Sequence, residues 1–158
     1  MKKVVEILLT AIVIALCAVG CAKEQKQFPS DEEIMKNISE YLDNAVYQDP
    51  AIFPSMNDFL EANLGLNDEN VLDATLYMGA PNRNTTYFLM ITKSENADTE
   101  LILQRLERIM QAQVKTAEMG YISGYREYDI IEKENKIFAI MHEDQQNYSD
   151  MRTYLNSL

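Results

Sequence analysis

Residues 86–92 read TYFLMIT and residues 137–141 read IFAIM, and these two stretches decide the fold. In both, apolar side chains fall on each face of an extended chain, which predicts strands that are covered on both sides. Residues 71–78 instead alternate between apolar and polar side chains, which predicts a strand with one buried face. The remaining strand, which is third in chain order, is predicted at 128–132 and has charges near both ends. The two doubly apolar strands should therefore lie at the centre of a sheet.

Helices are predicted before, between and after the two strand pairs. Residues 30–33 (SDEE) have the pattern of a capping box, and an apolar stripe extends the first predicted helix over 31–45. A short helix is predicted within 55–65, between a serine N-cap and a glycine C-cap. The strongest stripe predicts a long helix over about 98–119, and a last helix begins near Gln145.

This order of elements predicts a single α+β domain over residues 30–158. We number the predicted strands along the chain, as 71–78, 86–92, 128–132 and 137–141. An all-antiparallel, four-stranded sheet that places the two doubly apolar strands together then has the spatial order 1-2-4-3. The half-polar strands then become the edges, where charged residues are tolerated. One helix layer cannot cover both apolar faces. We therefore expect the long helix on one face, and the helix predicted over 31–45 to dock on the other.

The first twenty residues have the pattern of a secretory signal. Met1-Lys2-Lys3 is a basic start, and the apolar run from Ile7 to Val19 is broken only by Thr10. A helix of that length rises about 20 Å, short of the roughly 30 Å hydrocarbon core of a membrane. A cleaved signal peptide over residues 1–20 is therefore a better interpretation than a transmembrane span.

Residues 18–21 (AVGC) resemble the lipobox of bacterial lipoproteins, in which small residues lead directly into a cysteine. The resemblance implies that Cys21 receives a diacylglyceryl group and becomes the N-terminus, acylated with chains such as palmitate. Residues 21–29 are then a lipid-anchored tether. Two or more acyl chains give firm anchoring, which places the protein on the extracytoplasmic face of the cell membrane. The alternative is an ordinary cleaved signal peptide followed by an incidental cysteine.

Composition narrows the classes of partner. The chain has 158 residues and a formal net charge of −11, so a protein that binds the DNA or RNA backbone is disfavoured. It has two cysteines. Cys17 would leave with the signal peptide and Cys21 would be acylated, so no pair remains for a disulfide. The fold is expected to depend on packing alone.

The layout over about 60–158 resembles a family of small Gram-positive lipoproteins known only as a domain of unknown function. The resemblance rests on residues 63–71 (NLGLNDENV) before the first strand, on Asn84-Thr85-Thr86 before the second, and on the long helix that ends before Tyr121. It also includes the apolar strand 137–141 and the C-terminal helix. These are packing and turn features, so the resemblance implies a fold and carries no catalytic or ligand residues.

The sequence offers little for catalysis. It has one histidine, His142, which stands beside Glu143 and Asp144. These three residues either bind a metal or form an acid–base pair, or they are a solvated strand end before an acidic helix N-terminus, which we favour. No zinc or calcium spacing and no phosphate-binding loop is present in the sequence. We therefore expect no catalytic residue, no metal and no cofactor.

Three tyrosines lie within eight residues of one another at Tyr121, Tyr125 and Tyr128. A tyrosine has an apolar ring and a polar tip, so together they are a candidate rim for a peptide or glycan. The alternative, which we favour, is that they pack between the long helix and the edge of the sheet.

We expect a membrane-anchored lipoprotein that serves as a binding or accessory module of the cell envelope, with an envelope protein or peptide as a possible partner. Two alternatives stay open. One is an envelope hydrolase that uses surface carboxylates, and the other is a purely structural or immunity-type lipoprotein. A pocket holding two inward-facing carboxylates would favour the hydrolase, whereas a flat exposed apolar patch would favour a protein partner.

Overall fold

The computed structural model describes residues 28–42, 45–47, 55–79, 85–120 and 122–158. Its sheet contains the four predicted strands, which are β2 (Val71–Gly79), β3 (Tyr87–Lys93), β4 (Tyr128–Lys133) and β5 (Lys136–Met141). They pair in antiparallel fashion in the spatial order β2-β3-β5-β4. The predicted order 1-2-4-3 and the α+β class are therefore confirmed, with the doubly apolar strands at the centre.

A fifth, short strand lies outside the predicted set. β1 (Ala45–Tyr47) pairs with residues 77–79 at the end of β2, so the sheet is five-stranded. The helix predicted over 31–45 is consequently too long. α2 covers Asp31–Ile38, and a single 3₁₀ turn, η1 (Ser39–Tyr41), ends it. The backbone of β1 forms hydrogen bonds with the edge of β2 instead of helical hydrogen bonds. The periodicity of the side chains does not distinguish these two possibilities.

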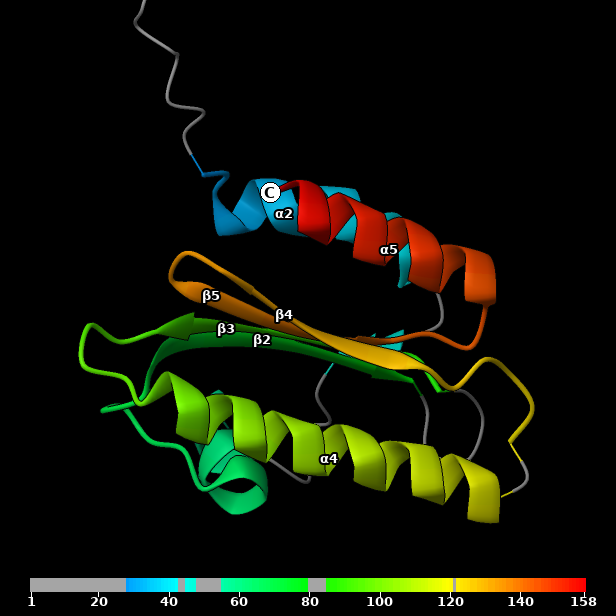
Figure 1. Ribbon diagram of the computed structural model, residues 1–158, viewed down its shortest axis with the longest axis horizontal. Coiled ribbons are helices and arrows are strands. Elements are labelled where there is room, and N and C mark those ends of the chain that lie inside the picture. Colours follow the sequence, from blue (N-terminus) through cyan, green and yellow to red (C-terminus); the bar gives the residue numbers. More distant parts are fainter. Residues whose placement is uncertain (1–27, 43–44, 48–54, 80–84, 121) are drawn as a thin grey trace, which may run out of the picture.

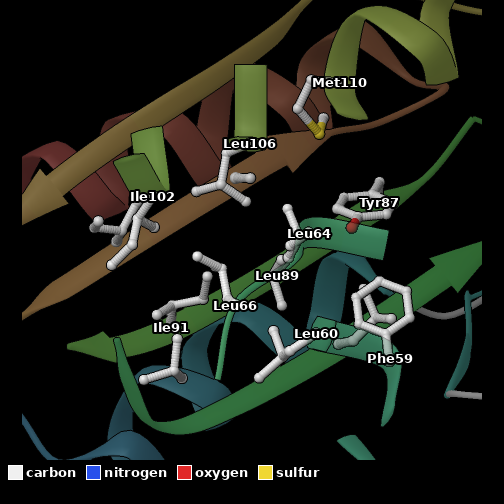
Figure 2. Close-up of a cluster of buried hydrophobic side chains, with 14 of the residues drawn as sticks. Phe59, Leu60, Leu64, Leu66, Tyr87, Leu89, Ile91, Ile102, Leu106 and Met110 are labelled. Carbon is white, nitrogen blue, oxygen red and sulfur yellow. The ribbon is translucent and has the colours of Figure 1, made fainter. Parts of the chain in front are cut away.

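One layer of helices covers the first face of the sheet. It consists of α4 (Thr99–Met119) and of α3 (Met56–Phe59), which continues into the π-helical turn η2 (Leu60–Leu64). Figure 1 shows α4 running along this face. The helices and the sheet enclose a cluster of buried side chains, which Figure 2 draws in close-up and which we call the α4 cluster. Its members include Phe59, Leu64, Leu76, Tyr87, Leu89, Ile91, Ile102, Leu106, Met110, Ile137, Ala139 and Met141.

A second layer covers the opposite face. It is formed by α2 and by the C-terminal helix α5 (Gln145–Ser157), which lie side by side above the sheet in Figure 1. The alternate side chains of β3 and β5 point into this layer, so the prediction that the N-terminal helix docks is confirmed. We call the resulting core the α2/α5 cluster, and it consists of Ile34, Ile38, Leu42, Phe88, Met90, Ile131, Phe138, Ile140, Tyr148, Met151 and Leu155.

Polar contacts hold α2 in place at several points along its length. The ammonium of Lys136, a buried residue of β5, forms an ion pair with Asp31 and donates to Thr92 Oγ1 at 2.8 Å. Asn37 Nδ2 donates to the Tyr154 hydroxyl of α5 at 3.1 Å. Because this layer is pinned by charge as well as by apolar burial, we regard α2 as part of the domain rather than of the tether.

The helix ends predicted from the sequence are formed. Ser30 and Ser55 accept hydrogen bonds from the backbone N–H groups of Glu33 and Asp58, at 3.2 and 3.1 Å. Gly65 ends η2 with a φ of 62°, in the left-handed region that glycine adopts without strain. Ser55 sets where α3 begins and Gly65 sets where η2 ends, and together they position Phe59 and Leu64 against the sheet.

Candidate functional site

The structure does not bring the predicted tyrosine rim together. Tyr121 lies outside the described residues. Tyr125 packs against the α2/α5 cluster, whereas Tyr128 packs against the α4 cluster on the other side of the sheet. The two described tyrosines therefore serve opposite layers and form no shared binding surface. Tyr128 packs near the long helix, as the packing alternative expected, whereas Tyr125 packs in the layer on the other face of the sheet.

Tyr125 belongs to a packed polar network. Its ring lies 5.1 Å from the ring of Tyr148, centroid to centroid. The Tyr148 hydroxyl donates to Asp129 Oδ2 at 2.9 Å, and Arg152 Nε contacts the same oxygen at 2.6 Å. Burial, and then the hydrogen bond to Asp129, raise the pKa of Tyr148 well above its usual range. This network joins α5 to β4 and has a structural role.

Carboxylates line a wide groove beside α4, but most of them have structural partners. The groove has a volume of about 560 Å³ and includes Asp98, Glu100 and Glu107. Asp98 caps α4 by accepting from the Leu101 N–H at 3.0 Å. Glu107 accepts from the Tyr128 hydroxyl at 2.6 Å, which raises the pKa of that phenol. Two of the three carboxylates are thus engaged, and the groove gives the hydrolase alternative no pair of free acids.

His142 is buried rather than part of a solvated strand end, which corrects the interpretation that we favoured. Its side chain is in the interior, and both ring nitrogens have partners. Nδ1 accepts from the Asp144 N–H at 2.9 Å, so Nε2 carries the proton and donates to the Tyr41 carbonyl at 2.7 Å. With both nitrogens occupied, His142 joins β5 to the turn after α2, and neither a metal nor an acid–base role is available to it here.

The predicted signal peptide and the lipidation of Cys21 concern residues that the structure does not describe. Lipidation therefore stays a prediction. Among the described helices, none has the length and apolar character needed to cross a membrane. Within the same residues, no group of three or more histidine, cysteine, aspartate or glutamate side chains is arranged to hold a metal ion.

The candidate site lies where α4 passes over the end of β2 and the beginning of β3. Two hollows adjoin there and share Met78, Tyr87 and Gln113. The first, the Thr116 hollow, has a volume of about 220 Å³ and also contacts Thr85, Thr86, Ala117, Ile122 and Met141. The second, the Phe59 hollow, has a volume of about 290 Å³ and also contacts Asn63, Ile109 and Ala112. We refer to the pair as the Tyr87 site.

Tyr87 is the unusual residue of this site. The residue is 3% exposed, and its hydroxyl has no hydrogen-bond partner among the described residues. Figure 2 shows the ring between Met110 of α4 and Phe59, with the oxygen directed toward the side where Leu64 lies. Burial raises the pKa of Tyr87 well above its usual range, so the hydroxyl stays protonated and is available as a donor. A buried donor without an acceptor costs about 1–3 kcal/mol, and such groups in native proteins call for an explanation.

The described residues that line the site are uncharged, in a chain of net charge −11. Several of its polar side chains are already engaged: Thr116 Oγ1 donates to the Ala112 carbonyl at 2.9 Å, and Asn63 Nδ2 donates to the Phe59 carbonyl at 3.0 Å. The Tyr87 hydroxyl thus stands out as a donor for which the described residues offer no acceptor, and the half-buried Gln113 lines the same two hollows. The arrangement can bind a small molecule, and its side chains include no nucleophile–base pair.

Sequence reasoning placed Tyr87 only as one of the apolar residues of a central strand. The period of two identifies which face a residue is on, but not whether its hydroxyl finds a partner there. The one signal in the sequence is a tyrosine, rather than a phenylalanine, in an otherwise apolar strand that is covered on both faces.

Comparison with known proteins adds no relative: no protein-family model, no curated protein and no solved structure matches this chain.

Proposed function

We propose that the protein is a lipid-anchored, extracytoplasmic binding module of the cell envelope, and that its ligand occupies the Tyr87 site. The observation that carries the binding proposal is the buried Tyr87 hydroxyl, which has no partner in the part of the chain that the structure describes and belongs to a residue that lines two hollows. The anchoring proposal rests on the lipobox-like residues 18–21 and on the basic, apolar leader before them. The resemblance of residues 60–158 to Gram-positive lipoproteins is in keeping with both and stays a prediction.

The position of Phe28 supports a domain that is anchored on one side and binds its ligand on the other. Phe28 packs against the α2/α5 cluster, and the segment from Cys21 to Phe28 spans at most about 25 Å when fully extended. On this proposal the α2/α5 layer is the one nearest the membrane. The Tyr87 site belongs to the α4 layer, on the opposite side of the sheet (Figure 1). The site therefore faces away from the lipid anchor, where an envelope ligand has access.

The observations favour a small ligand over a flat protein interface. Among the described residues, the large apolar side chains that are strongly exposed are Leu72 and Met119. They lie at the start of β2 and at the end of α4, and such isolated residues are ordinary on a protein surface. Both faces of the sheet are covered by helices, so neither is free for a partner.

Anchoring is tested by intact-mass analysis of the protein isolated from its own membranes. We expect the mass of a chain that begins at Cys21 and carries acyl groups. In the Cys21→Ser variant the acylated form should be absent, with the precursor retained or the chain released. An uncleaved and unmodified wild-type chain in the membrane fraction would refute the anchor.

Binding is tested by mass spectrometry of small molecules that co-purify with the mature protein in its own lipids. Ala112 lies at the exposed rim of the Phe59 hollow, so Ala112→Trp should fill that hollow without entering the core. Thr153→Trp, at an exposed position of α5 in the other layer, is the matched control. We expect a species that is present with the wild type and with Thr153→Trp but depleted with Ala112→Trp. Equal recovery from all three proteins would contradict the proposed site.

A further inference from the structure

The lining of the Tyr87 site restricts the charge of what it holds. A charged ligand would lose its hydration on entering and would meet no counter-charge from the described residues that line the two hollows. The contrast with the neighbouring groove on α4 is sharp, since that groove presents Asp98, Glu100 and Glu107. A neutral ligand pays no such desolvation cost, so the site discriminates by charge.

Size restricts the ligand further. A cavity of about 150 Å³ is large enough to hold one benzene ring, whereas drug-sized pockets run from about 300 Å³ upward. The two hollows, at about 220 and 290 Å³, each suit one ring or a group of similar volume. Their apolar lining, which includes Met78, Ile109 and Met141, favours an apolar body for that group.

The Tyr87 hydroxyl specifies one polar feature. It is a protonated donor, so the ligand must present an acceptor such as a carbonyl or an amide oxygen. The hydroxyl oxygen is shielded in this structure, and the other residues shared by both hollows are Met78 and Gln113. A ligand atom therefore reaches the hydroxyl only when side chains of the site move, and Met78 and Gln113 have long, unbranched side chains that can change rotamer.

We propose that the Tyr87 site recognises a neutral, ring-sized molecule with an apolar body, whose single acceptor takes the hydrogen bond of the Tyr87 hydroxyl. This inference rests on the proposed binding function and adds the chemical class of the ligand. The Gln113 amide lies beside both hollows and offers a second, weaker polar contact.

The test uses benzamide, benzoate and benzamidinium, which have nearly the same shape. Benzoate keeps an acceptor and adds a negative charge, benzamidinium is positively charged and has no acceptor, and cumene is neutral and has no acceptor. Each is titrated into the mature, lipid-anchored protein in nanodiscs, with its methionine methyl groups labelled with ¹³C and the free probe concentration set by dialysis. The methyl groups of Met78 and Met141 report on the site. The Met151 methyl group, in the α2/α5 cluster, is the internal control.

We expect saturable shifts of Met78 and Met141 with benzamide, no shift of Met151, and affinities at least tenfold lower for both charged analogues and for cumene. Tyr87→Phe should weaken benzamide by about three- to tenfold, the worth of one hydrogen bond. Ala112→Trp should abolish binding in the Phe59 hollow, and Thr153→Trp should leave it unchanged.

Other outcomes would overturn the inference in distinguishable ways. Equal affinity for the three charge states would refute the neutral class, and unchanged benzamide binding by Tyr87→Phe would refute the role of the hydroxyl. If no probe binds, the ligand class is wrong, while the proposed function still stands or falls on the co-purification experiment with Ala112→Trp.

Discussion

The His142 imidazole joins the end of β5 to the turn after α2. Replacing it with phenylalanine keeps the ring volume but removes the partner of the Tyr41 carbonyl and of the Asp144 N–H in two partly buried hydrogen bonds. We expect His142→Phe to lower the free energy of unfolding by about 2–3 kcal/mol, as measured by urea denaturation. His142→Asn is a graded control, because a short amide can still accept from the N–H two residues ahead. A loss below about 0.5 kcal/mol in the phenylalanine variant would contradict the two hydrogen bonds.

Tyr87 and Tyr148 give the domain a dependence on alkaline pH. The folded structure raises the pKa of both phenols, chiefly through burial, above the value of 10.0 that they have in the unfolded chain. Above about pH 10 the folded state therefore binds more protons than the unfolded state, and the free energy of unfolding falls as the pH rises.

Urea denaturation at about pH 9 and pH 11 measures this dependence. We expect a lower midpoint at the higher pH, and a smaller difference between the two in Tyr148→Phe, which removes one of the phenols. If the variant and the wild type lose the same stability over this range, the phenols do not account for it.

At the scale of elements, α2 is the piece whose role the structure settles most clearly. Ile38 is fully buried in the α2/α5 cluster, and Glu40, two residues further on, is exposed. Ile38→Ala should cost about 2–4 kcal/mol in urea denaturation, whereas Glu40→Ala should stay within about 0.5 kcal/mol. Deleting residues 30–54 should also expose Phe88 and Phe138 and cause aggregation. A truncated domain that stays monomeric and equally stable would mean that α2 is only part of the tether.

Much of the element level could be predicted from the sequence, because local signals and tertiary packing agree there. The caps at Ser30 and Ser55 and the C-cap at Gly65 depend on residue type and spacing alone. The double-sided strands 86–92 and 137–141 required two helix layers, and the structure has both. β1 could not be predicted, since a three-residue strand is stabilised by an edge that lies far away in the sequence. The first helix was predicted to run to residue 45, but α2 ends at Ile38, because Ala45 pairs with that distant edge as part of β1.

The site was much less predictable than the fold. Tyr125 and Tyr128 are close in the sequence, but their side chains pack in the clusters on opposite sides of the sheet. Conversely, Met78, Tyr87 and Gln113 meet from three separate elements, and no local spacing marks them as a group. Whether a buried hydroxyl finds an acceptor is decided by the exact positions of its neighbours, which only the folded structure supplies.

At the scale of the whole molecule, three layers of packing account for the fold without a covalent link. The α4 and α2/α5 clusters bury apolar residues on both faces of one sheet. We expect residues 28–158 to fold alone, and their melting temperature to be unchanged by a chelator or by a thiol reductant. A shift of several degrees with either reagent would reveal a metal or a disulfide on which the fold depends.

The central claim is that Tyr87 carries a donor kept for a ligand rather than for the fold, and thermal unfolding of Tyr87→Phe without ligand tests it most directly. Removing a buried hydroxyl that has no partner relieves its desolvation cost, so the account predicts a gain of about 1 kcal/mol, seen as a melting temperature raised by about 3–5 °C. A Tyr87→Phe protein that melts several degrees below the wild type would contradict the account, because it would show that the hydroxyl already has a structural partner.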